Sequence, residues 1–277
     1  MCSVTRPRFD LLGDVHGMLR TLEAMVGKLG YLKKRGRWTH PAGRTLVSVG
    51  DLLDRGPDPL GCVELMAAMV DDGRAQMVLG NHEINALHFM AGLREHSEKN
   101  RTQFRTTLRQ IEAAPHRWGA AERFIRNCPT RLELDDGRLR VIHACWSLPH
   151  VPSLPERLDD RTLWRRAAKG GDLEDTIEAC IHGPEEPCAP FRDKDGQLRD
   201  HWRVAWWRTY PADAPFLAFG HYWFPWPNGR TPREPELLGP ERNAACLDYS
   251  AGKGGPMVAL RYPEMEFVTV ACRDELA

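Results

Sequence analysis

The sequence predicts an α/β protein, because short apolar runs end at polar residues and helical patterns separate the first of these runs. The runs are FDLLGD, TLVSVGD, QMVLGNH, LRVIHA and FLAFGH, at residues 9–14, 45–51, 76–82, 139–144 and 216–221. Apolar stretches of this length, rich in Val and Leu and bounded by Gly, are typical of buried strands. We therefore expect a strand in each run and helices between the first three.

The two connecting segments predict amphipathic helices. Residues 18–31 place Leu22, Val26 and Leu29 on one face. Residues 59–70 do the same with Val63 and Met66. An apolar stripe of this period is the face that a helix packs against a sheet.

The rest of the chain is less regular. Residues 84–127 predict an inserted helical cover, and residues 147–215 a variable segment at the substrate rim that includes a helix with Asp172 as N-cap. Residues 245–262 and 264–273 read as strands around a Gly-rich turn, which we expect to extend a second sheet.

Composition excludes several classes of protein. The 277 residues are 42% hydrophobic, and 38 Lys and Arg balance 38 Asp and Glu, so no overall charge attracts nucleic acid or an anionic membrane. No apolar run approaches the ~20 residues that span a bilayer. The eight cysteines form no C-x-x-C pair, and the N-terminus lacks an apolar signal region. We expect a cytoplasmic protein that binds neither membranes nor nucleic acid.

The polar residues at the strand ends predict a metal centre, because ligands gather at the carboxyl ends of strands in an open α/β sheet. Oxygen and imidazole ligands suit divalent Mn, Fe or Zn. One carboxylate can bridge two ions about 3.5–4 Å apart, and such a pair lowers the pKa of a shared water, whose hydroxide attacks phosphorus. We expect Asp51 to be the bridge. The six predicted ligands are Asp14, His16, Asp51, Asn81, His143 and His221.

Three further residues predict the rest of the chemistry. His82 follows Asn81 directly, and its imidazole can give a proton to the leaving group near neutral pH. Asp54 can hold the other nitrogen of that ring. The planar fork of Arg55 suits phosphate oxygens.

These residues lie in motifs that resemble the calcineurin-like metallophosphoesterases. GDVHG at 13–17, GDLLDRG at 50–56, GNHE at 80–83, VIHA around His143 and FGH at 219–221 follow the order of that family. The nearest resemblance is to its phosphoprotein phosphatase branch, with bacterial and phage serine/threonine phosphatases and symmetrical diadenosine tetraphosphatases. The resemblance implies two packed mixed β-sheets flanked by helices, in a single metallophosphoesterase domain over residues 1–277.

The resemblance also implies cofactors and roles. It assigns the six ligands to two divalent ions, with Mn²⁺ as the first expectation and Fe or Zn as alternatives. His82 and Asp54 become the acid pair and Arg55 a phosphate-binding arginine. Arg166, in LWRR at 163–166, matches a second such arginine, with Arg165, Arg203 and Arg208 as alternatives.

The main functional hypothesis is a metal-dependent hydrolase of phosphomonoesters that resembles the serine/threonine phosphatases. A symmetrical dinucleoside tetraphosphate hydrolase of the Ap4A type is the alternative within enzymes, and a catalytically silent metal-binding scaffold is the alternative of another class. GHYWFP stands at residues 220–225, where family members often have GHTP, so the substrate rim is the least predictable part.

Aromatic and sulfur side chains leave two further alternatives open. The tryptophans either pack the interior or stack a nucleobase: Trp146, Trp164, Trp202, Trp206, Trp207, Trp223 and Trp226. Four cysteines, at positions 128, 145, 180 and 188, are weighed as a zinc site, although they lack paired spacing.

Overall fold

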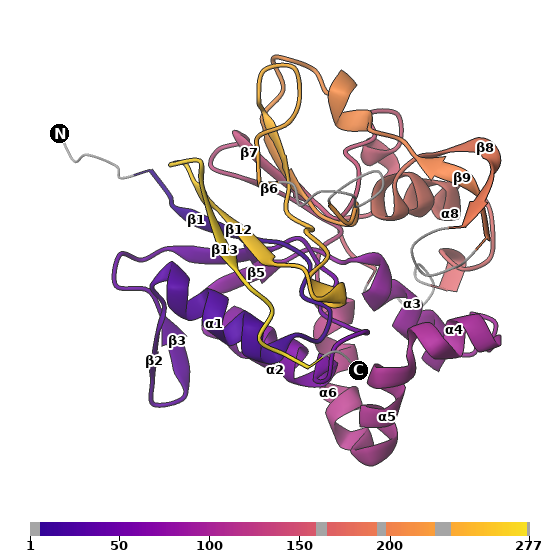
Figure 1. Ribbon diagram of the computed structural model, residues 1–277, viewed down its shortest axis with the longest axis horizontal. Coiled ribbons are helices and arrows are strands. Elements are labelled where there is room, and N and C mark those ends of the chain that lie inside the picture. Colours follow the sequence, from indigo (N-terminus) through magenta and orange to yellow (C-terminus); the bar gives the residue numbers. More distant parts are fainter. Residues whose placement is uncertain (1–5, 159–164, 193–197, 225–233, 276–277) are drawn as a thin grey trace.

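The computed structural model describes residues 6–158, 165–192, 198–224 and 234–275, and Figure 1 shows two β-sheets with helices around them. The first sheet has the strand order β13-β12-β1-β4-β5, and the second has the order β11-β10-β7-β6. The strands of these sheets are β1 (Phe9–Leu12), β4 (Thr45–Ser48), β5 (Ala75–Met77), β6 (Arg131–Leu134), β7 (Leu139–Ile142), β10 (Phe216–Phe219), β11 (Ala244–Cys246), β12 (Met257–Tyr262) and β13 (Glu266–Val270).

All five apolar runs contain strands. β1, β4 and β5 run parallel in the first sheet, and β7 and β10 run parallel in the second. The helices α1 (Leu19–Leu29) and α2 (Pro59–Asp71) connect the first three, as their period predicts. α1 ends at Gly30, whose φ of 102° suits a residue without Cβ, and Asp58 caps α2 by accepting from the Gly61 N–H at 2.9 Å.

One cluster of buried apolar side chains extends across both sheets. Phe216 of β10 and Tyr262 of β12 meet between them, with ring centroids 6.1 Å apart. Because Phe216 begins β10 and Tyr262 pairs with Phe9 at the start of β1, this contact joins the amino ends of the parallel strands of the two sheets. The predicted fold class, two mixed sheets flanked by helices, is confirmed.

The sheet predicted for the C-terminal strands is partly wrong. β11 does join the second sheet, but β12 pairs antiparallel with β1 and β13 pairs with β12, so both extend the first sheet. The fully buried Leu11 and Leu260 are partners in the pairing of β1 with β12. β12 thereby covers the edge of β1 that β4 leaves open. An antiparallel hairpin fits there because it needs no crossover helix.

The segment predicted as a helical cover is helical over α3 (Asn81–Met90), α4 (Glu98–Gln103), α5 (Arg105–Ala113) and α6 (Pro115–Asn127). The 147–215 segment contains the helix α8 (Asp172–Ile177), the π-helix η2 (Glu178–His182), the hairpin of β8 (Glu185–Arg192) and β9 (Leu198–Arg203), and the 3₁₀ turns η1 (Val151–Ser153) and η3 (Trp206–Thr209). Two further elements were not expected: the hairpin of β2 (Leu32–Lys34) and β3 (Arg37–Thr39), and the 3₁₀ turn η4 (Ala251–Lys253). Asp172 is the first residue of α8 and not its cap, because Gly171, with φ 98°, occupies the cap position.

No helix in the described ranges is both long enough and apolar enough to cross a membrane. The single-domain organisation over residues 1–277 stays a prediction.

Candidate metal centre and active site

The six predicted ligands lie just beyond the carboxyl ends of β1, β4, β5, β7 and β10, and all six are buried. Two glycines of the motifs are needed for this packing. A Cβ on Gly80 would collide with Asp51 Oδ1, and a Cβ on Gly220 would collide with Asp14 Oδ1. The Gly before each ligand therefore lets the backbone approach a carboxylate from a neighbouring strand.

The backbone of the site is held in a sparsely populated conformation. Left-handed φ angles between 49° and 73° occur at five predicted site residues: His16, Asp51, Asp54, Arg55 and His221. Non-glycine residues adopt this region at a cost, and such strain is concentrated at functional sites.

Nitrogen and oxygen atoms converge on the Asp51 carboxylate. Asp51 Oδ2 lies 3.7 Å from His16 Nε2, 3.4 Å from His143 Nε2 and 3.9 Å from His82 Nε2. Two groups of potential ligands share Asp51: one with His16 and His82, and one with His143 and His221. In each group the ligand atoms lie within 4.8 Å of one another. A carboxylate common to two groups is the position expected of a bridging ligand.

The remaining predicted ligands join the same cluster. Asn81 Oδ1 lies 3.0 Å from His143 Nε2 and 2.9 Å from His221 Nδ1. Asp14 Oδ2 lies 3.8 Å from His16 Nε2 and accepts the His221 backbone N–H at 3.1 Å. The structure thus brings all six side chains together.

Two histidines are oriented by backbone carbonyls behind them. His16 Nδ1 donates to the Leu53 carbonyl at 3.1 Å, and His143 Nδ1 donates to the Val49 carbonyl at 2.7 Å. Each bond turns the Nε2 lone pair toward the cluster, as the outer partners of metal-binding histidines commonly do. The buried His16 Nε2 has no hydrogen-bond partner within the described ranges.

Charges within the site shift the pKa values in different directions. Burial, with Arg55 next, lowers the pKa of His16, and burial, with Arg203 next, lowers that of His221. Burial and the nearby Asp248 raise the pKa of Asp14. Burial would lower the pKa of His143, but the Asp51 carboxylate outweighs it and raises that pKa to about 10. The Asp51 carboxylate therefore stabilises the positive form of His143, but not that of His16.

This donor set fits divalent metal ions. It consists of buried carboxylate, amide and imidazole atoms, which suit Mn, Fe or Zn. The His16 Nε2 that lacks a hydrogen-bond partner among the described residues is free to bind such an ion. The alternative zinc site at the cysteines finds no support: within the described ranges, neither group of potential ligands contains a cysteine.

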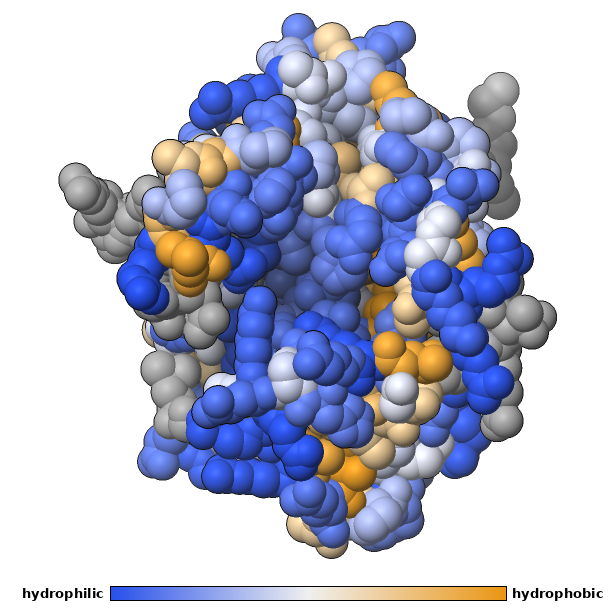
Figure 2. Space-filling view, turned by 90° about the vertical axis from the view of Figure 1, so that its right-hand side faces the viewer, coloured by the Kyte–Doolittle hydropathy of each residue, from blue (hydrophilic) through white to orange (hydrophobic). Residues whose placement is uncertain are grey.

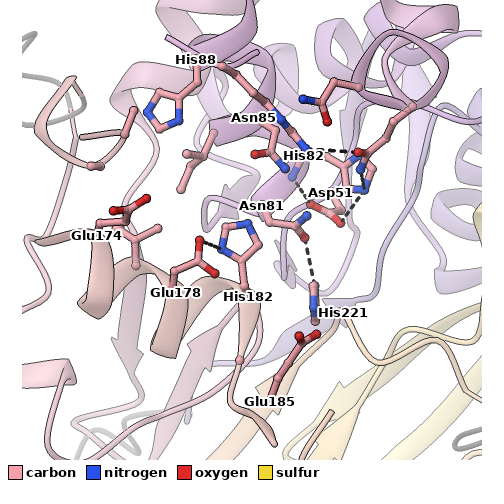
Figure 3. A pocket seen from close by; sticks show the side chains of 18 of the residues that line it. Asp51, Asn81, His82, Asn85, His88, Glu174, Glu178, His182, Glu185 and His221 are labelled. Atoms are coloured by element: carbon pink, nitrogen blue, oxygen red, sulfur yellow. Dashed lines mark hydrogen bonds and ion pairs between the residues drawn. The ribbon is translucent and has the colours of Figure 1, made fainter. Parts of the chain in front are cut away.

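His82 and Asp54 form a buried hydrogen-bonded pair. His82 Nδ1 donates to Asp54 Oδ2 at 2.5 Å, and both side chains are buried. The other nitrogen, Nε2, faces the cleft beside Asp51 (Figure 3).

Arg55 and Arg203 meet at Trp223. The guanidinium carbon of Arg55 lies 4.4 Å from the centroid of the indole ring, and that of Arg203 lies 5.0 Å from it. Arg203 also donates to the His221 carbonyl at 2.5 Å. The buried Arg55 Nε has no acceptor among the described residues. Both arginines line the cleft, whereas Arg166 is exposed and does not.

The cluster opens into a cleft of about 780 Å³. Figure 2 shows it as a hollow lined by hydrophilic residues. Arg94, Lys99 and Arg199 add positive charge to its walls. Glu174, Glu178 and Glu185 lie across the space from Asp51 and His82 (Figure 3). A cleft of this size accommodates a ligand much larger than one phosphate.

Sequence reasoning missed two buried residues that support the site. Glu83 accepts backbone N–H groups of Asp51 at 2.8 Å, Leu52 at 2.9 Å and Gly80 at 3.0 Å. Thr107 Oγ1 donates to Asp54 Oδ1 at 2.6 Å. Glu83 completes the GNHE motif and could have been suspected, but no pattern in the helical cover distinguishes Thr107.

Most described tryptophans pack the interior. Trp146, Trp206 and Trp207 are buried, Trp202 is exposed, and Trp223 lines the cleft. Trp164 and Trp226 lie outside the described residues.

Relatives and solved structures resemble the chain over nearly its whole length. The asymmetrical bis(5'-nucleosyl)-tetraphosphatase PrpE of Geobacillus thermodenitrificans is 32% identical over 267 residues, 94% of this chain and 93% of its own. That of Halalkalibacterium halodurans is 30% identical over 275 residues, 97% and 96% of the two chains. Their names agree better with the nucleotide alternative than with the main hypothesis, although they specify asymmetrical cleavage and the alternative expected symmetrical cleavage.

Two solved structures share the fold. A cold-active protein-tyrosine phosphatase of a psychrophilic Shewanella aligns with a TM-score of 0.57 at 17% identity, over 95% of this chain and 80% of its own. A protein serine/threonine phosphatase of Saccharomyces cerevisiae aligns with a TM-score of 0.52 at 12% identity, over 100% of this chain and 82% of its own.

The family model described as calcineurin-like phosphoesterase matches residues 7–222, a range that contains every predicted metal ligand and the acid pair. Divalent metal ions and hydrolysis of phosphoester bonds are common to this family. The chain therefore belongs to the calcineurin-like phosphoesterases and is a phosphoester hydrolase.

Proposed function

We propose that the protein hydrolyses bis(5'-nucleosyl) tetraphosphates, cleaving them asymmetrically into a nucleoside triphosphate and a nucleoside monophosphate. The observation that carries the proposal is the cleft of about 780 Å³ that leads from the ligand cluster past Arg55, Arg94 and Lys99. A single phosphoryl group needs far less room and positive charge than this. The names of the full-length relatives support the same substrate class and the asymmetrical cleavage.

In this proposal the six predicted ligands hold two divalent ions, with Mn²⁺ expected first. Asp51 would be a ligand of both ions, because it belongs to both groups of potential ligands. When bound, such ions supply Lewis acidity and lower the pKa of bound water.

The protein side chains bind the substrate and move the proton. Arg55 and Arg203 hold the oxygens of the scissile phosphate, and Trp223 keeps both guanidinium groups in place. Arg203 thus takes the role expected of Arg166, which is exposed at the surface. His82 gives the proton on Nε2 to the leaving oxygen, while Asp54 holds Nδ1.

A substrate panel tests this function. Purified protein supplied with Mn²⁺ is given diadenosine tetraphosphate, a serine phosphopeptide and p-nitrophenyl phosphate, and the nucleotide products are separated by chromatography. We expect ATP and AMP, with kcat/KM highest for the tetraphosphate. Two molecules of ADP would instead indicate symmetrical cleavage.

The other outcomes of the panel distinguish the alternatives. A higher kcat/KM for the phosphopeptide would favour the phosphomonoesterase, whose support is the phosphoprotein phosphatase resemblance. Bound metal without any turnover would favour the scaffold. The cytoplasmic location stays a prediction.

A further inference from the structure

The helical cover places a positive charge beyond the acid histidine. Gln103, the last residue of α4, has its Nε2 3.5 Å from His82 Nε2. Arg94, in the loop after α3, donates from Nη2 to Gln103 Oε1 at 3.3 Å. His82, Gln103 and Arg94 all line the cleft, so they form a row that leads from the acid along its wall.

Arg94 lies near two carboxylates, although burial outweighs their attraction and lowers the pKa of its guanidinium. It is half-buried, and both the Asp54 and the Glu178 carboxylates attract its guanidinium, which offsets part of the cost of burial. Asp54 belongs to the acid pair, and Glu178 lies across the cleft. The guanidinium therefore lies in the field of both walls rather than in open solvent.

The position of the acid defines the position of the leaving group. In an in-line displacement, the attacking and leaving oxygens lie on opposite sides of phosphorus. The water oxygen forms the new P–O bond, the bond to the bridging oxygen breaks, and the electron pair stays on that oxygen. Since His82 Nε2 protonates the bridging oxygen, the next group of the substrate lies beside Gln103 and Arg94.

We propose that Arg94, positioned by Gln103, binds the leaving phosphate and gives the enzyme its preference for phosphoanhydrides over phosphomonoesters. This inference rests on the proposed function. In a phosphoanhydride the bridging oxygen belongs to a second phosphate, which gains negative charge as the bond breaks. A guanidinium beside it stabilises that charge in the transition state. An alkyl or aryl leaving group offers no such charge.

The test compares variants by their selectivity. Arg94→Met, Arg94→Lys and wild type are assayed with Mn²⁺ on diadenosine tetraphosphate, inorganic tripolyphosphate and p-nitrophenyl phosphate. The matched control is Arg101→Met, since Arg101 is an exposed arginine of α4 that does not line the cleft. We expect Arg94→Met to lower the ratio of kcat/KM for tetraphosphate over p-nitrophenyl phosphate about 10- to 100-fold, the range for one charge-assisted hydrogen bond. Arg94→Lys should retain part of the ratio, and the control should match wild type.

The outcomes separate this inference from the proposed function. An unchanged ratio in Arg94→Met, or an equal loss on all three substrates, overturns the inference while tetraphosphate hydrolysis by wild type upholds the function. If wild type hydrolyses tripolyphosphate but not diadenosine tetraphosphate, the proposed function fails. A loss on tripolyphosphate in Arg94→Met would then still support the leaving-phosphate site. Activity on neither oligophosphate overturns both.

Discussion

At the scale of single residues, Thr107 shows how a neutral side chain can orient an acid pair. Its hydroxyl donates to Asp54 Oδ1 at 2.6 Å and accepts the Asp54 backbone N–H at 3.1 Å. The other oxygen of Asp54 holds His82 Nδ1. With both oxygens engaged, the carboxylate cannot rotate away from the ring, and His82 Nε2 stays directed at the cleft.

Replacing Thr107 by Val should therefore impair proton donation more than binding. The variant leaves Asp54 Oδ1 buried without its donor, which costs about 1–3 kcal/mol, so we expect kcat to fall about 10-fold on phenyl phosphate. The loss should be smaller on p-nitrophenyl phosphate, whose leaving group needs less protonation. Thr107→Ser keeps the hydroxyl and should restore most of kcat. Equal losses on both substrates, or no rescue by Ser, would assign Thr107 a purely structural role.

At the scale of elements, Glu83 joins the loop after β4 to the first turn of α3. Its two oxygens accept N–H groups from Asp51, Leu52 and Gly80, so one fully buried side chain shapes both segments that carry ligands. Burial and the neighbouring Asp51 charge raise the pKa of Glu83 to about 7. The cost of burying this carboxyl group is offset by the backbone donors that it matches.

Glu83→Gln should lower the stability of the fold. An amide can accept through one oxygen only, so either orientation turns an NH₂ group toward buried backbone donors, and each unmatched donor costs about 1–3 kcal/mol. We expect urea denaturation in the presence of EDTA to show a free energy of unfolding at least ~2 kcal/mol below wild type. Glu112→Gln, at an exposed position of α5, is the control and should match wild type. A smaller decrease in the free energy of unfolding would mean that the loop after β4 does not depend on the hydrogen bonds of Glu83.

The elements also show what could be read from the sequence. The five buried strands and the helices α1 and α2 were predictable, because period and glycine boundaries are local signals. The sheet joined by β12 and β13 was predicted wrongly, since pairing with β1 depends on which edge remains open after β4 has paired. Likewise, the predicted ligands stand at strand ends, whereas Thr107 and Gln103 reach the site only through the docking of the helical cover.

At the scale of the whole molecule, Asp135 connects the two sheets far from the cleft. It lies in the turn between β6 and β7, and its buried carboxylate accepts from Arg6 Nε at 2.7 Å, ahead of β1, and from the hydroxyl of Tyr262 in β12 at 2.8 Å. Arg138 Nη2 adds a third bond at 2.9 Å. Hydrogen bonds from Arg138, followed by those from Arg6 and Tyr262, outweigh burial and hold the pKa of Asp135 well below its ordinary value.

The contribution of Asp135 to stability should therefore depend on pH. The unfolded chain takes up a proton at about pH 3.9, above the pKa in the folded state, so the stabilisation is complete above that pH and is lost as the pH falls further. We expect Asp135→Asn to lower the free energy of unfolding by about 2 kcal/mol at pH 7, and the difference from wild type to shrink by pH 3. Urea denaturation in EDTA at both pH values measures it, with Asp136→Asn as the control, because that neighbouring side chain is 87% exposed. A difference that stays constant between pH 7 and pH 3 would mean that the negative charge of Asp135 contributes nothing to holding the sheets together.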